Sequence, residues 1–130
     1  MNSLQTSPEF TGEETDYPSQ GKTTIAPDVL IAITRLTTLG VHGVSRMSPV
    51  PGGVNRYFQR GTSEGVRLQV KDGIVSADLY IILEKNFIIK DVSQKVQQQV
   101  HRAITETVGM PVGMINIHVE DINYSEESEA

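Results

Sequence analysis

The sequence contains no cysteine, which excludes disulfide bridges and thiolate metal sites and permits a reducing compartment. It also lacks long apolar segments. No apolar run exceeds five residues, as in Val29 to Ile33, whereas a membrane-spanning helix needs about 20. The first residues show neither the basic stretch nor the apolar stretch of a secretory signal. We therefore expect a protein that does not insert into a membrane by itself.

Charged residues are unevenly distributed along the chain, whose formal net charge is −5. Residues 1–20 contain four acidic residues and no Lys or Arg, and residues 124–130 contain three acidic residues, which leaves +2 for the middle. Acidic segments with few aliphatic residues cannot bury enough apolar surface to fold. We therefore expect disordered acidic tails at 1–20 and 124–130 around one folded domain at 21–123.

The first part of the domain carries the signals of a helix. Pro27 suits the first helical position, and Asp28 suits the first turn. The sequence predicts a helix over 27–39, a short strand over 22–25 before it and an extended segment over 41–47 after it. The apolar stripe expected on this helix comprises Val29, Ala32, Ile33, Leu36, Leu39 and Gly40.

Two segments with strict alternation of apolar and polar residues flank Asp72-Gly73. This dipeptide is typical of a two-residue turn, so the pattern predicts a β-hairpin. One register satisfies both faces, since Arg67 then lies opposite Asp78 as a pair of opposite charges on the polar face. The apolar pairs of that register are Val66 with Leu79, Leu68 with Ala77, and Val70 with Val75.

Apolar residues recur at helical spacing from Ile89 to Val108, and Gly109 and Pro111 follow as helix terminators. Alternation then predicts a last strand over 113–122. A strand that follows a long helix commonly returns in parallel to the same sheet. The expected fold class is α+β: a mixed three- to four-stranded sheet with two helices packed on one face.

Side chains that could bind a metal or act in catalysis do not occur at the spacing of known motifs. His42, His101 and His118 have no second histidine or carboxylate at the spacing of a zinc motif. The sequence contains neither the Gly-x-Ser-x-Gly elbow nor the Ser-x-x-Lys motif of serine nucleophiles. We expect surface histidines, no metal, no cofactor and no enzymatic activity.

A proline- and glycine-rich segment at 48–53 opens a long loop that ends near residue 64. Two arginines flank two aromatic residues there. Arginine and aromatic side chains in this arrangement can bind a protein partner, stack on single-stranded nucleic acid, or pack on the domain edge. The charge of +2 argues against nucleic acid. The sheet face away from the helices is either solvated or a surface for self-association or docking. The candidate partner-binding residues are Arg56, Tyr57, Phe58, Arg60, Arg67 and Tyr80.

Five segments, in this order and spacing, resemble the alkaline-shock-protein family of envelope stress proteins. The resemblance extends over roughly residues 21–123. Two features depart from the family pattern: Lys85-Asn86 stands where the family often has Tyr-Gly, and the linking loop, often glycine-rich in the family, here carries the Arg-Tyr-Phe segment. The segments that carry the resemblance are 21–29, 41–44, 65–75, 96–100 and 115–119.

The resemblance implies a cytoplasmic protein held near the membrane by partners, with no catalytic residues to carry over. It leads us to expect a non-enzymatic scaffold or adaptor of the bacterial cell-envelope stress response. Its partners would be proteins, including a membrane-anchored one, and a homo-oligomer is also compatible. The alternatives are a nucleic-acid-binding regulator that uses residues 55–60, and an accessory protein of lipid metabolism.

Overall fold

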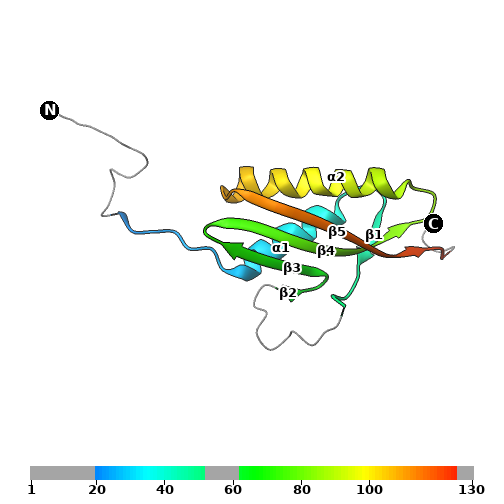
Figure 1. Ribbon diagram of the computed structural model, residues 1–130, viewed down its shortest axis with the longest axis horizontal. Helices are drawn as coiled ribbons and strands as arrows, with labels where there is room; N and C mark the ends of the chain where they lie inside the picture. The colour runs from blue at the N-terminus through cyan, green and yellow to red at the C-terminus, as the bar shows by residue number, and fades with distance from the viewer. Residues whose placement is uncertain (1–19, 52–61, 126–130) are drawn as a thin grey trace.

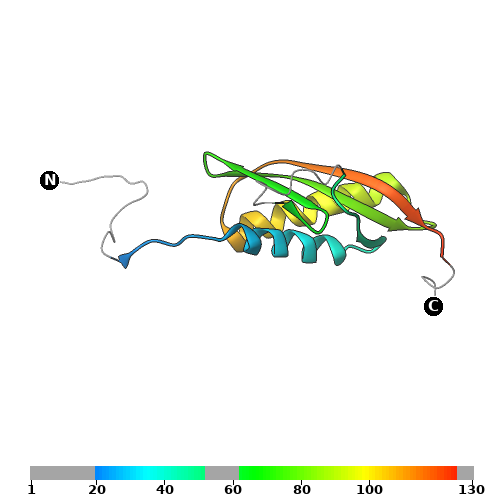
Figure 2. The same ribbon diagram turned by 90° about the horizontal axis from the view of Figure 1, so that it is seen from below.

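A computed structural model describes residues 20–51 and 62–125. The tails expected at 1–20 and 124–130 lie almost wholly outside these ranges. The described chain folds into one sheet covered on one face by two helices, as Figures 1 and 2 show. The α+β class and the mixed sheet are therefore confirmed.

The elements follow the expected order. In sequence they are α1 (Pro27–Leu39), β1 (Val44–Met47), β2 (Thr62–Ser63), β3 (Val66–Lys71), β4 (Ile74–Glu84), α2 (Ile89–Arg102), the π-helical turn η3 (Ala103–Val108) and β5 (Val112–Asn123). In residues 20–51 and 62–125 the sheet has five strands rather than three or four, because the extended segment before the loop and the two-residue β2 both join it.

β4 is the central strand of the sheet. It pairs antiparallel with β3 along its first half and with β1 along its second half, and parallel with β5 along nearly its whole length. The hairpin register is the predicted one, with Arg67 opposite Asp78. Asp72 (φ 55°) and Gly73 (φ 77°) both adopt the left-handed conformation that a two-residue hairpin turn requires.

The core lies between the sheet and the helix layer. Alternate residues of β4 point into it, and α2 covers them with Val92, Val96, Val100 and, in η3, Ile104. This is the predicted stripe of the second helix, although Ile89 at its start is exposed. The predicted helix over 89–108 changes to π-helical geometry at Ala103 and ends where Gly109 (φ 85°) is left-handed.

The orientation of α1 differs from the prediction. The predicted stripe lies outward, where Leu36 is 60% exposed and Val29 is 48% exposed. Two threonines replace it in the core, and the hydroxyl of Thr38 donates to the carbonyl of Thr34 (2.8 Å), which satisfies that buried donor. The buried hydroxyl of Thr34 has no hydrogen-bond partner among the described residues, so only Thr38 buries its methyl group without an unsatisfied hydroxyl. The buried residues of α1 are Leu30, Ile31, Thr34 and Thr38.

The predicted strand over 22–25 does not form. Residues 21–26 are exposed and lead directly into α1 in the helix layer (Figure 2), so they have no strand edge to pair with. Within 20–51 and 62–125, no helix is both long and apolar enough to cross a membrane.

Candidate interaction surfaces

The sheet face away from the helices collects polar side chains from three strands. Cross-strand register places Arg67 beside Asp78, Asp78 beside Asn116, and Tyr80 beside His118. Residues 67 and 80 were predicted as candidate partner-binding residues, and the structure brings them into the same group. We call Arg67, Asp78, Tyr80, Asn116 and His118 the sheet-face cluster.

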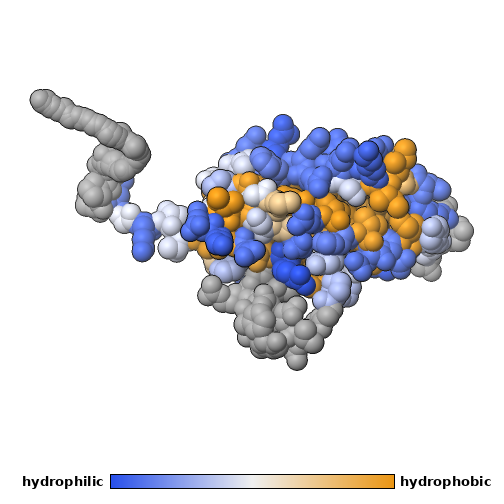
Figure 3. Space-filling view, viewed as in Figure 1, coloured by the Kyte–Doolittle hydropathy of each residue, from blue (hydrophilic) through white to orange (hydrophobic). Residues whose placement is uncertain are grey.

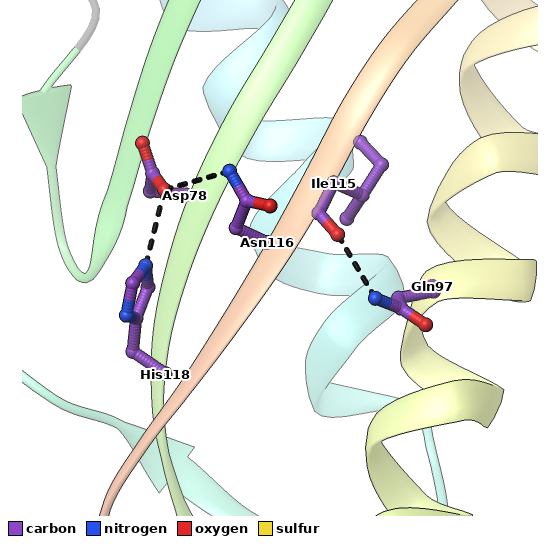
Figure 4. A network of polar contacts seen from close by, with 5 residues as sticks. All are labelled: Asp78, Gln97, Ile115, Asn116 and His118. Carbon is purple, nitrogen blue, oxygen red and sulfur yellow. Dashed lines mark hydrogen bonds and ion pairs between the residues drawn. The ribbon is translucent and has the colours of Figure 1, made fainter.

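Asp78 is the centre of the sheet-face cluster (Figure 4). Its Oδ1 lies 3.0 Å from Nε2 of His118 and accepts a second hydrogen bond of 3.2 Å from the side-chain amide of Asn116. Both partners come from β5, so the two contacts join the parallel pair β4 and β5 through side chains as well as backbone. Neighbouring polar groups on the sheet therefore satisfy one another.

Tyr80 is stacked within the same cluster. Its ring lies 4.5 Å from that of His118 at an interplanar angle of 12°, and the guanidinium carbon of Arg67 lies 5.6 Å from the Tyr80 ring centroid. The tyrosine is only 6% exposed, so it is less accessible to a partner than the alternation of residues suggested. It instead holds His118 and Arg67 in place.

The predicted ion pair between Arg67 and Asp78 is not formed, although the register that opposes them is correct. Asp78 takes its partners from β5, and Arg67 turns toward Tyr80. Within the described ranges, Arg67 therefore has no carboxylate partner. The reason is that Asn116 and His118 of β5 reach Asp78. The prediction from the sequence considered only the two strands of the hairpin.

The second candidate surface lies in the helix layer. A groove of about 690 Å³ runs between the C-terminal half of α1 and α2. Its apolar lining includes Leu36, which also lies on the exposed face of α1, and Asp91 and Lys95 of α2 supply charges of both signs. We call this the α1–α2 groove; its apolar residues are Leu36, Val41, Phe87 and Val92.

One wall of the α1–α2 groove is tightly packed. His42 contacts Phe87 edge-on, with ring centroids 4.9 Å apart and an interplanar angle of 82°. Gly43 (φ 107°) lies behind them, and a Cβ atom there would lie 2.8 Å from Val92 and 3.0 Å from Phe87. Only glycine fits this position, so the backbone at Gly43 packs directly against Val92 and Phe87.

α2 also contacts the outer edge of β5. The side-chain amide of Gln97 donates to the carbonyl of Ile115 at 3.0 Å (Figure 4). β5 pairs with β4 alone among the described strands, so Gln97 occupies one acceptor of an edge that otherwise offers backbone groups. This contact adds a polar link between the helix layer and the sheet to the apolar packing of the core.

The structure describes only some of the other residues that the sequence singled out. Arg56, Tyr57, Phe58 and Arg60 lie outside the described residues, and their role stays a prediction. His42 and His101 are exposed, and His118 is partly exposed. In the part of the chain that the structure describes, no three His, Asp or Glu side chains gather as metal ligands would.

The α1–α2 groove was missed from the sequence. One signal was present, because α1 carries two stripes at helical spacing: one with Leu30, Ile31, Thr34 and Thr38, the other with Val29, Ile33 and Leu36. A helix that is apolar on both sides has more apolar surface than one core contact can cover. That excess indicated a second contact surface.

Comparisons with known proteins place the chain in a family. Residues 15–124 match the model of the alkaline shock protein 23 family, described as having a cell envelope-related function. The protein Spy1535 of Streptococcus pyogenes serotype M6 is 33% identical over 103 residues, which cover 78% of this chain and 79% of that protein. YqhY of Bacillus subtilis (strain 168) is 25% identical over 111 residues, covering 84% and 82% of the two chains.

YloU of the same Bacillus subtilis strain is 25% identical over 84 residues, covering 64% of this chain and 70% of YloU. No solved structure matches the chain. The family model spans nearly the whole described fold, including the hairpin, α2 and β5 that carry the resemblance to alkaline-shock proteins. The chain therefore belongs to the alkaline-shock protein family, whose function is related to the cell envelope.

Proposed function

We propose that this protein is a non-enzymatic cytoplasmic adaptor or scaffold of cell-envelope homeostasis and stress response. It works by binding protein partners, one of them anchored in the membrane. Membership in a family of cell envelope-related function supports a role at the cell envelope. The observation that carries the binding role is the outward apolar face of α1, where Val29, Leu36 and Leu39 remain exposed and Leu36 also lines the α1–α2 groove.

This face has the composition of a partner-binding site. Burying a whole leucine side chain contributes roughly 1.5–3 kcal/mol, and Leu36 keeps 60% of its surface exposed, so a partner that covers it gains a large part of that energy. The adjoining groove has apolar walls with Asp91 and Lys95 at their side. An apolar centre with polar neighbours is the usual anatomy of a protein–protein interface.

The charges favour a protein over a lipid surface as the occupant. Stable peripheral binding to an anionic leaflet needs a cluster of cations or an acyl chain beside the apolar residues. The α1–α2 groove instead carries one acidic and one basic side chain, Asp91 and Lys95. A protein segment can pair with both. The link to the membrane then depends on the partner.

The test is flotation with vesicles. The purified protein is expected to remain unbound to liposomes of anionic lipid, to float with membrane vesicles from the source cell, and to lose that binding when the vesicles are first treated with protease. Tight binding to the liposomes alone would overturn the proposal. So would equal binding to treated and untreated vesicles.

Two matched variants locate the contact. Leu36→Asp places a carboxylate in the α1–α2 groove, and Gln98→Asp makes a similar change on the exposed face of α2, outside the residues that line it. Leu36→Asp is expected to abolish flotation with native vesicles, whereas Gln98→Asp is expected to retain it. Equal flotation of the two variants would show that the partner binds elsewhere.

A further inference from the structure

The sheet-face cluster lies on a surface that no described element covers. Both helices pack on the opposite face (Figure 2), and Figure 3, which looks onto the open face, shows polar and apolar side chains mixed over the strands. At one end of this face Ile74 and Met114 are 43% and 65% exposed. A mixed surface with exposed apolar residues at its end is suited to contact with another protein surface.

The charges at the centre of this face are arranged in an unusual way. Arg67 and Asp78 lie side by side in register on β3 and β4 without pairing with each other. Asp78 uses Oδ1 for both of its contacts with β5. The guanidinium of Arg67 has no carboxylate partner among the described residues. The face thus presents a positive and a negative group as neighbours, each with hydrogen-bonding capacity left.

This arrangement is complementary to itself. Two sheets pack face to face about 10 Å apart. A two-fold axis between two copies, parallel to the strands and midway between β3 and β4, sets β3 of each copy over β4 of the other. Arg67 of one copy then faces Asp78 of the other, and the same pair forms a second time by symmetry, as in any isologous interface. Gln69 faces Ser76 in the same register.

We propose that the sheet-face cluster binds a second copy of this chain through reciprocal Arg67–Asp78 pairs. This surface is separate from the α1–α2 groove, so it can succeed or fail independently of the proposed function. Three strands of about six residues cover roughly 15 by 20 Å, which is small for a specific interface. The dimer is therefore reversible, and added salt weakens it because its central contacts are ionic.

Charge reversal tests the proposal on the full chain by sedimentation equilibrium. Arg67→Glu places two carboxylates opposite each other across the interface, and Asp78→Arg places two guanidinium groups opposite each other. Each variant alone is expected to raise the dissociation constant at least about tenfold. An equimolar mixture of the two is expected to dimerise again, because every cross-copy contact then joins opposite charges. The double variant R67E/D78R is expected to dimerise by itself for the same reason.

A control and a second measurement keep the result interpretable. Lys90→Glu reverses a charge on α2 outside the α1–α2 groove and is expected to leave the dissociation constant unchanged, while circular dichroism checks that each variant is folded. Because the chain has no cysteine, Gln69→Cys provides a single thiol beside Arg67 without altering the charged pair. A short bis-maleimide is expected to cross-link it into dimers, and Gln98→Cys on α2 is expected to stay monomeric.

Three results would overturn the proposal. The first is a wild-type chain that remains monomeric at hundreds of micromolar, and the second is a folded pair of single variants whose mixture does not dimerise. The third is equal cross-linking of Gln69→Cys and Gln98→Cys. This third test does not depend on whether the Asp78→Arg variant folds.

Discussion

The two outer faces of this molecule expose different chemistry. On the helix layer, α1 leaves apolar side chains such as Leu36 exposed beside a groove. On the sheet, Asn116 and His118 both bond to Asp78, and Tyr80 is buried between its neighbours. An apolar face gains energy from any surface that fits it, whereas a patterned polar face selects by charge and register. The first is the surface proposed for a different protein, and the second is the surface proposed for a copy of this chain.

The largest expected effect concerns the core that both faces share. Val96 is fully buried between α2 and the sheet, so Val96→Asp buries an unpaired charge and is expected to cost about 4–5 kcal/mol or more, enough to unfold most of the population. Gln97→Asp, one residue along, loses only the hydrogen bond to Ile115 and is expected to cost about 1 kcal/mol. Urea unfolding measures both, and equal losses would contradict the assignment of the helix face.

The two stripes of α1 are distinguished by a second pair of variants. Ile31 is buried against the sheet and Leu36 is exposed. Ile31→Ala is expected to destabilise the domain by about 2–5 kcal/mol, because it leaves a cavity. Leu36→Ala is expected to change stability by less than about 0.5 kcal/mol while weakening flotation with native vesicles. A large loss of stability from Leu36→Ala would mean that α1 packs through its other face.

On the sheet face, His118→Ala removes both the stack on Tyr80 and the contact with Asp78. Since His118 is partly exposed, the expected loss is about 1 kcal/mol, measured by thermal unfolding. His101→Ala, on the exposed side of α2, is the matched control and is expected to have no measurable effect. If both variants behave alike, the sheet-face cluster contributes nothing to stability.

The smallest effect is expected outside both faces. A chain lacking residues 1–20 and 125–130 is expected to unfold within about 1 kcal/mol of the full chain, because these segments contribute few apolar groups. Differential scanning calorimetry of the two chains makes the comparison. A greater loss would show that a tail docks on one of the two faces, and repeating the Leu36→Ala and His118→Ala measurements in the shortened chain would show which.

Local patterns in the sequence were sufficient for much of the fold. The alternation around Asp72-Gly73 predicted the hairpin residue by residue, because a turn of two residues leaves only one register in which both faces agree. Pro27 and the spacing of Val92, Val96 and Val100 likewise predicted where α1 begins and which side of α2 is buried. These features depend on residues that are close in the chain, so short-range rules predict them.

The sequence by itself therefore determined the order of the elements, the hairpin register, the core face of α2 and the family resemblance. Only the tertiary structure decided which stripe of α1 faces the core, since either stripe is apolar enough and the sheet accepts one of them. It also decided the partners of Asp78, because Asn116 and His118 reach that carboxylate only after β5 returns beside β4, about 40 residues along the chain. Both choices depend on contacts between distant segments, which local spacing does not encode.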